Sequence, residues 1–375
     1  MKNDLMGLIF AENPEASMGE LTGVRSLAAV PFGGRYRIID FILSNMVNSS
    51  IINVGLATPY NHQSLSDHLG TGKDWDIDRK GNGLFLLPPK DPSEASEIKG
   101  GIDVLHDISH YLGKCRQDYI LVADCNTLCN IDFSEVLKFH LENEADITLI
   151  YNETGALSPK ELKTRILLDI DADNKVNDIE VYPLVQKTNA SYMHMFIIRR
   201  TTLLELVGDA VAHNRHIISK DLFLPNLTHM KICAYKHEGY ARQIDNIKSF
   251  FAANLELLNK DIRNELFGLE NDMPIYTKVK DSVPTKYAAS AEVSNSIIAD
   301  GCLIEGTVKN SILFRGVHIG KGATVENCIL MQKSEVMDNC LLENVIFDKE
   351  VVLRTNKKLV GQDTYPMVIG KKTII

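Results

Sequence analysis

Four copies of a short repeat near the C-terminus constrain the fold of this chain more than any other feature. Each copy has an aliphatic residue, an asparagine two positions later and an apolar residue two positions after that; the copies lie at 293–297, 308–312, 325–329 and 342–346. They are 15, 17 and 17 residues apart. Units this short cannot bury their own apolar faces and must stack on their neighbours. We therefore predict a β-helix with about eighteen residues per three-sided coil.

Turn residues and the fixed asparagines support the same prediction. Val317–Gly320 has the pattern of a hexapeptide repeat, and Gly301, Gly316 and Gly322 lie at expected turns. One asparagine per coil at a constant position predicts an internal asparagine ladder. The alternative is an antiparallel sheet of short strands.

The first two thirds of the chain alternate apolar strands with helical patterns, which favours a mostly parallel sheet covered by helices. Expected strands are 5–11, 52–58, 119–123, 146–151 and 193–198, and expected helices are 37–50, 62–69, 101–112, 133–144 and 245–261. We predict an α/β domain over 1–260, a linker over 261–287 and the β-helix over 288–375.

Composition limits the function classes. The 375 residues carry a net charge of −9 without a long basic run, so we expect no nucleic-acid partner. No apolar stretch is long enough for a membrane span, and the N-terminus does not have the pattern of a signal peptide. The seven cysteines contain no Cys-x-x-Cys pair. This pattern indicates free thiols in a reducing cytoplasm and no metal site.

The segment after the first strand is unusual for an α/β domain. Such strands commonly end in a glycine-rich turn whose N–H groups bind phosphate. Here the strand 5–11 is followed by no glycine until Gly19, and the turn carries Glu12 and Glu15 but no basic residue. We expect this turn to repel a phosphate.

Several strings in the chain resemble glucose-1-phosphate adenylyltransferase, the ADP-glucose pyrophosphorylase of glycogen synthesis. These strings are Ala29–Phe41 (AVPFGGRYRIIDF), Leu43–Ser49, Gly72–Arg79 and Asn310–Gly320. The resemblance covers nearly the whole chain. It implies a Rossmann-like nucleotidyltransferase domain of the GT-A type with a mixed sheet, followed by a left-handed parallel β-helix.

The positions that carry catalysis in that family differ in this chain. The family loop A-G-G-R-G-T-R-L begins at Ala11, but Glu12 and Asn13 replace its glycines, and Pro14 and Ser17 replace its arginines. A further basic position corresponds to Leu27, and the second metal carboxylate corresponds to Gln243. Glutamine is a poorer magnesium ligand than a carboxylate. The resemblance therefore implies degenerate catalytic positions at Ser17, Leu27 and Gln243.

Other family positions persist as vestiges. The resemblance implies remnants of the substrate site at Lys99, Asp124, Lys187 and Ser191. It also implies an effector or anion role for Arg35 and Arg37 (the alternative is a structural ion pair). We expect no firmly bound cofactor or metal; Mg²⁺ would bind only if the residual site holds a nucleotide.

These losses are similar to those of the GlgD-type subunit of the family. The resemblance implies a non-catalytic or regulatory chain that assembles with a GlgC-type catalytic subunit, most simply as a heterotetramer, and that responds to a sugar phosphate or another anion. One alternative is a weakly active enzyme that makes ADP-glucose from ATP and glucose-1-phosphate. Another is a sugar-phosphate sensor that acts without a catalytic partner.

Overall fold

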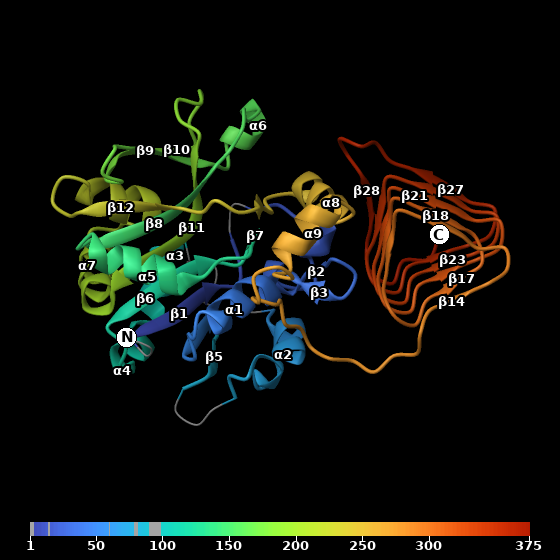
Figure 1. Ribbon diagram of the computed structural model, residues 1–375, viewed down its shortest axis with the longest axis horizontal. Coiled ribbons are helices and arrows are strands. Elements are labelled where there is room, and N and C mark those ends of the chain that lie inside the picture. Colours follow the sequence, from blue (N-terminus) through green and yellow to red (C-terminus); the bar gives the residue numbers. More distant parts are fainter. Residues whose placement is uncertain (1–3, 14–15, 60, 79–81, 90–98) are drawn as a thin grey trace.

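The computed structural model describes residues 4–13, 16–59, 61–78, 82–89 and 99–375. Glu15, Pro14 and Arg79, which the sequence analysis singled out, lie outside the described residues. An α/β part and a coiled β part lie side by side, and residues 267–285 run along one edge between them (Figure 1).

A mixed sheet forms the centre of the α/β part. Its order is β10-β9-β11-β6-β1-β4-β5, and β8 pairs with both β11 and β12. Strands β1, β4, β5 and β6 are mutually parallel, and β11 runs antiparallel to β6. The strands are β1 (Leu5–Phe10), β4 (Val54–Ala57), β5 (Leu84–Leu87), β6 (Tyr119–Asp124), β8 (Ile147–Glu153), β9 (Ile166–Ile170), β10 (Val176–Val181), β11 (Ala190–Arg199) and β12 (Ile232–Lys236). The five strands expected from the sequence are confirmed.

Helices cover both faces of this sheet. Successive β1 side chains point to opposite sides and are apolar, so both faces have apolar side chains to bury. Ile9 joins the apolar core under α1, α5 and α8, whereas Leu8 joins the core under α3, α4 and α7. The helices are α1 (Ile38–Asn48), α2 (Gln63–Leu69), α3 (Gly101–Asp107), α4 (Ser109–Lys114), α5 (Phe133–Glu142), α6 (Pro159–Leu162), α7 (Arg200–Ala212), α8 (Ile247–Glu256) and α9 (Lys260–Leu266). No helix of the described residues is long and apolar enough to cross a membrane.

Two expected helices are each divided in the structure. The helix expected over 101–112 breaks at Ile108, which caps both α3 and α4. The helix expected over 245–261 divides into α8 and α9, and Asn259 caps α9 by accepting from the Asp261 N–H at 2.9 Å. The expected linker therefore contains most of α9 as well as β14 (Lys286–Tyr287).

The segment between α9 and β14 is held against the α/β part. The Tyr276 N–H donates to Ser44 Oγ at 2.9 Å, and Asn48 Nδ2 donates to the Pro274 carbonyl at 3.1 Å. Both partners lie on α1. These bonds fix the path of the chain toward the C-terminal part.

The C-terminal part is a left-handed parallel β-helix with three five-stranded sheets, and all pairings within these sheets are parallel. The antiparallel alternative is therefore wrong. The first sheet contains β14, β17 (Leu303–Ile304), β20 (His318–Ile319), β23 (Glu335–Val336) and β26 (Val352–Leu353). The second contains β15 (Glu292–Ser294), β18 (Thr307–Lys309), β21 (Thr324–Glu326), β24 (Leu341–Glu343) and β27 (Lys358–Val360). The third contains β16 (Ile297–Ile298), β19 (Ile312–Leu313), β22 (Ile329–Leu330), β25 (Val345–Phe347) and β28 (Met367–Ile369).

The third sheet joins the two parts. Leu313 and Leu330 fill the core of the coil, whereas their neighbours Ile312 and Ile329 belong to the core of the α/β part. Gly34, at φ +88°, faces this sheet, and a Cβ there would lie 3.5 Å from Ile297 Cγ2, an ordinary contact distance. Because successive side chains of each strand point to opposite faces, both faces of the third sheet are buried.

The asparagines of the repeat lie at corners of the coil. Asn295, Asn310, Asn327 and Asn344 all have φ between +41° and +55°, a left-handed conformation that asparagine tolerates better than most residues. Asn295 Nδ2 donates to Asn310 Oδ1 at 2.7 Å, but Asn295 is exposed. The bond between Asn295 and Asn310 therefore lies at an exposed corner, whereas Asn344 is 5% exposed and donates to the Gly361 carbonyl at 3.5 Å.

A buried ion pair links the two parts directly. Arg25 donates from Nη1 and Nη2 to both carboxylate oxygens of Asp348, each at 2.9 Å, and both side chains are at most 2% exposed. Such bidentate pairs add geometric specificity. The pair fixes the β-helix relative to the segment that follows β1.

Candidate functional site

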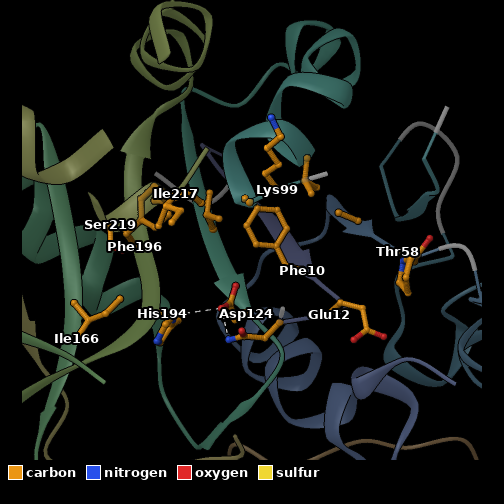
Figure 2. A pocket seen from close by; sticks show the side chains of 18 of the residues that line it. Phe10, Glu12, Thr58, Lys99, Asp124, Ile166, His194, Phe196, Ile217 and Ser219 are labelled. Atoms are coloured by element: carbon orange, nitrogen blue, oxygen red, sulfur yellow. Dashed lines mark hydrogen bonds and ion pairs between the residues drawn. The ribbon is translucent and has the colours of Figure 1, made fainter. Parts of the chain in front are cut away.

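A cavity of about 720 Å³ opens at the C-terminal ends of β1 and β6. In open α/β sheets this edge is where ligands bind. Figure 2 shows the Phe10 ring between Lys99 on one side and Asp124 on the other. Ile217 and Ser219 close another side.

One carboxylate organises the polar end of the cavity. Asp124 Oδ2 accepts from Asn13 Nδ2 at 3.2 Å and lies 3.3 Å from His194 Nδ1. Both interactions are dashed in Figure 2. The His194 ring also stacks on Tyr192, with 5.2 Å between ring centroids. Asp124 is thus held by neighbours from β11 and from the segment after β1.

An irregularity in β11 places His194 at this site. The register between β11 and β8 shifts between Tyr192 and Phe196, and His194 has φ +57°. Such bulges re-aim side chains next to functional sites.

The turn at His216 and Ile217 packs closely against Gly100 and forms the opposite wall of the cavity. The Asp221 carboxylate accepts from the N–H groups of His216 and Ile217, both at 2.9 Å, and so fixes this turn. A Cβ on Gly100 would lie 2.2 Å from the His216 carbonyl oxygen. Gly100, which precedes α3, therefore allows this wall to approach.

Glu12 lines the cavity and also contacts the segment at Leu27. Its Oε1 accepts from the Leu27 N–H at 3.1 Å, and burial raises its pKa to about 7, opposed by that hydrogen bond. Leu27 is 1% exposed within the core of the α/β part.

A guanidinium occupies the neighbourhood of Gln243. Arg165 Nη1 donates to Gln243 Oε1 and lies 2.9 Å from Asp245 Oδ2. Thr164 Oγ1 and Asn126 Nδ2 also donate to the Asp245 carboxylate, at 3.3 and 3.4 Å. The Asp245 carboxylate is therefore paired with the Arg165 guanidinium inside the protein.

A second cavity, of about 410 Å³, lies between the α/β part and the β-helix. We call it the interdomain cleft. Basic side chains from both parts line it: Arg35, Arg37, Lys278, Lys280, Arg315, Lys333 and Lys349. The acidic lining residues in the described chain are Asp300 and Glu350. This balance favours an anionic ligand.

Several of these cations already contact protein groups. Arg37 Nη1 donates to the carbonyl and to the hydroxyl of Ser64, at 2.6 and 3.0 Å. The Arg35 guanidinium lies 5.2 Å from the centre of the Tyr36 ring. Arg37 is thus fixed in place, whereas Arg35 is exposed at the rim.

Charge crowding is strongest at Lys349. Burial, together with Arg37 and Arg25, lowers the pKa of Lys349 to about 7, although Asp348 acts in the opposite direction. Burial and the neighbours Arg37 and Arg315 also lower the pKa of Lys280. A bound anion would relieve this repulsion.

Comparisons with known proteins agree with these two parts. Residues 18–259 match the nucleotidyl transferase family, and residues 242–365 match the GlmU-like, C-terminal hexapeptide family. Glycogen biosynthesis protein GlgD of Bacillus subtilis (strain 168) is 35% identical over 369 residues, which covers 98% of this chain and 96% of that protein. GlgD of Geobacillus stearothermophilus is 40% identical over 327 residues, covering 87% and 84%. The chain belongs to the glucose-1-phosphate adenylyltransferase family, on its GlgD-type branch. A glucose-1-phosphate adenylyltransferase of Geobacillus stearothermophilus is 32% identical over 332 residues, again covering 87% and 84%.

Within this GlgD-type chain, the three positions that were expected to be degenerate lie in different surroundings. Ser17 is exposed and pairs with the segment before α8 through its N–H, which donates to the Asp245 carbonyl at 2.7 Å. Leu27 is buried in the core, and Gln243 is bound by Arg165. The structure therefore brings Ser17 and Gln243 to one region, and it places an apolar side chain at the third position.

The magnesium site implied by the family has no matching donor set here. Asp124 is engaged by Asn13 and His194, and the Gln243 amide accepts from a guanidinium. Magnesium prefers several anionic or carbonyl oxygens in octahedral geometry. Among the described residues, no group of three or more His, Cys, Asp or Glu side chains is placed to hold a metal.

The four expected remnants of the substrate site do not all lie together in the structure. Lys99 lines the cavity together with Asp124. Lys187 instead forms an exposed ion pair with Glu180. Ser191 is 3% exposed at the point where β11 pairs with both β8 and β9. Lys99 and Asp124 are thus the two vestiges that share the site.

The sequence analysis missed four groups at these sites. Asp245 lies two positions after Gln243, and this displaced carboxylate was the available signal for a rebuilt pair with Arg165. His194 depends on a bulge, and Arg25 pairs with a residue 323 positions away. No local pattern indicates either of these two contacts.

Proposed function

We propose that this chain is the regulatory subunit of an ADP-glucose pyrophosphorylase in glycogen biosynthesis. In this proposal it assembles with a GlgC-type catalytic chain, most simply as a heterotetramer, and makes no ADP-glucose itself. The main supporting observation is the Arg165–Gln243–Asp245 cluster, in which a guanidinium contacts the residue at the position of the second metal carboxylate.

Electrostatics at the cavity argue against turnover. Attack on the α-phosphate of ATP needs metal ions and positive charge that stabilise the transition state. The acidic, basic and histidine side chains that line the cavity in the described residues are Glu12, Asp124, Lys99 and His194. Removing one such stabilising group typically lowers kcat by ~10²–10³. The loss of several leaves too little stabilisation for an ordinary rate.

The interdomain cleft supports the regulatory part of the proposal. An anion such as a sugar phosphate would contact Arg35 and Lys280 from one part and Lys333 from the β-helix. Because the cleft is built from both parts, a bound anion would contact both of them. Coupling between two sites of this kind is typically about 1–3 kcal/mol.

Two measurements test the proposal. Pyrophosphate release from ATP and glucose-1-phosphate is followed with the purified chain alone, and we expect no rate above background. Light scattering on an equimolar mixture with the catalytic chain should show a hetero-oligomer heavier than either chain alone. Ordinary turnover by the single chain would instead support the weakly active enzyme.

The stand-alone sensor remains the second candidate, and the basic interdomain cleft is the observation that favours it. Both candidates require an anion in the cleft, but only the subunit requires a partner. If the chains stay separate in light scattering while an anion binds this chain, the sensor is the better account.

A further inference from the structure

A third cavity, of about 310 Å³, lies at the opposite end of β6 from the first one. Tyr119 and Arg199 are cross-strand partners there, where β6 begins and β11 ends. The end of α5, the loop before β8 and the first turn of α7 complete the wall. We call it the basal cavity; its polar lining residues in the described chain are Tyr119, His140, Glu144, Asp146, Arg199 and Thr202.

A guanidinium and a phenol are joined on one side of the basal cavity. Arg199 Nη2 donates to the Tyr119 hydroxyl at 3.0 Å, and the guanidinium carbon lies 5.1 Å from the centre of the Tyr119 ring. Because the phenol oxygen accepts this bond, its own hydrogen is free to donate. Within the described parts of the chain, Arg199 forms no ion pair with a carboxylate. This side therefore offers a positive charge and a neutral donor to an anionic group.

A buried histidine adds a third donor. His140 is 2% exposed, its ring meets the Tyr119 ring edge to face, and its Nδ1 lies 2.8 Å from Thr148 Oγ1. The Thr148 hydroxyl has no other acceptor among the described residues, so it donates to Nδ1 and the hydrogen of the neutral ring is on Nε2. Burial lowers the pKa of His140 to about 4, with Arg199 acting in the same direction and Asp146 against it. The Nε2–H group has no acceptor in the described chain, and such a buried donor favours a ligand that supplies one.

Two carboxylates line another part of the same cavity. Glu144 and Asp146 flank Ala145 in the loop between α5 and β8. Asp146 Oδ2 accepts from the Lys231 N–H at 2.8 Å, and neither carboxylate forms an ion pair with another described residue. A phosphate dianion near Arg199 would also face these two negative charges. A ligand that has one positive and one negative group would match both sets.

We propose that the basal cavity binds a small zwitterion with one carboxylate and one ammonium group, of the size of an α-amino acid. Its carboxylate accepts from Arg199, Tyr119 and His140, and its ammonium group donates to Glu144 and Asp146. The site goes beyond the proposed function. It is built from the α/β part alone, so binding there requires neither the interdomain cleft nor a catalytic partner.

Titrations of the full chain at pH 7, followed by saturation-transfer NMR, test the need for both charges. L-Alanine is the probe, L-lactate replaces its ammonium group with a hydroxyl, and L-alaninamide replaces its carboxylate with a neutral amide. We expect saturable binding of L-alanine, at least about tenfold tighter than that of either analogue, because each analogue leaves one set of protein charges without its partner. Absence of saturable L-alanine binding, equal binding of the three compounds, or inorganic phosphate that binds as tightly as L-alanine overturns the proposal.

Two variants locate the binding. Arg199→Gln removes the positive charge and should weaken L-alanine binding at least about tenfold, whereas Arg116→Gln changes an exposed arginine that does not line the cavity and should have no effect. Ala145→Leu fills the cavity and should abolish binding. Its matched control is Ala252→Leu, which changes a half-buried alanine of α8 away from the cavity. Binding that survives Ala145→Leu, or that changes equally in a variant and its control, contradicts the assigned site.

Discussion

At the scale of single residues, Glu12 links the end of β1 to the segment at Leu27. A glycine at this position would leave backbone N–H groups open to a phosphate. Glu12 instead caps the Leu27 N–H, and the Leu27 side chain enters the core. The hydrogen bond between the Leu27 backbone and the Glu12 carboxylate therefore ties the end of β1 to the segment at Leu27.

Replacing Glu12 with glutamine should stabilise the protein in a pH-dependent way. The pKa of Glu12 is raised from 4.5 to about 7 in the folded state. Between these values the folded chain binds more protons than the unfolded chain, so its stability falls as pH rises through the window. Glu12→Gln removes this loss and should gain up to about 3 kcal/mol at pH 8 and little at pH 4. Urea unfolding at both pH values measures it, and a gain that is independent of pH contradicts the assignment.

At the scale of elements, the β-helix depends on corners and on one ion pair. Corners require left-handed residues, and asparagine meets this requirement in all four repeats. The ion pair between Arg25 and Asp348 fixes the orientation of the coil. Neither the corner asparagines nor the ion pair lines the cavity at the ends of β1 and β6.

The corner at Asn310 should prefer glycine to alanine. Asn310 has φ +46° and accepts the Asn295 amide at 2.7 Å. Asn310→Ala loses this bond and adds left-handed strain, and we expect a loss of about 1–3 kcal/mol. Asn310→Gly loses only the bond and should cost about 1 kcal/mol or less. Thermal unfolding of the two variants compares them, and an alanine variant as stable as the glycine variant would refute the corner argument.

Breaking the buried pair should be far more costly than breaking a surface pair. Arg25→Ala leaves Asp348 buried without its partner, which typically costs about 3–5 kcal/mol. The matched control is Lys138→Ala, which removes an exposed pair with Glu135 at 3.7 Å and should cost less than about 0.5 kcal/mol. Urea unfolding measures both, and similar losses would mean that the buried pair contributes nothing special.

At the scale of the whole molecule, local patterns predicted the elements but not their long-range contacts. The repeat and the strand–helix alternation predicted both folds, because period and turn residues are local properties. The corner position of the asparagines was missed because it depends on backbone handedness. Arg25–Asp348 and Asp124–His194 join distant segments, and no spacing rule finds such pairs.

Anion binding in the interdomain cleft should strengthen as pH falls. Lys349 has a pKa lowered to about 7, so it is mostly neutral at pH 8 and mostly charged at pH 6. Sulfate, whose own charge is constant in this range, should bind up to about tenfold more tightly at pH 6. Lys349→Met should remove most of this pH dependence. Calorimetry measures it, and an unchanged pH profile in the variant would exclude Lys349 as the titrating group.

The most direct test of the regulatory account is an activity titration. A fixed amount of the GlgC-type catalytic chain is mixed with increasing amounts of this chain, and the rate of ADP-glucose synthesis is followed. The account predicts a rise in kcat or a fall in KM of about 5–150-fold that saturates at a fixed stoichiometry. The variant Gln243→Asp should give the same saturating curve, because the effect does not depend on this chain's own chemistry. A rate that does not change at any ratio of the two chains would contradict the account.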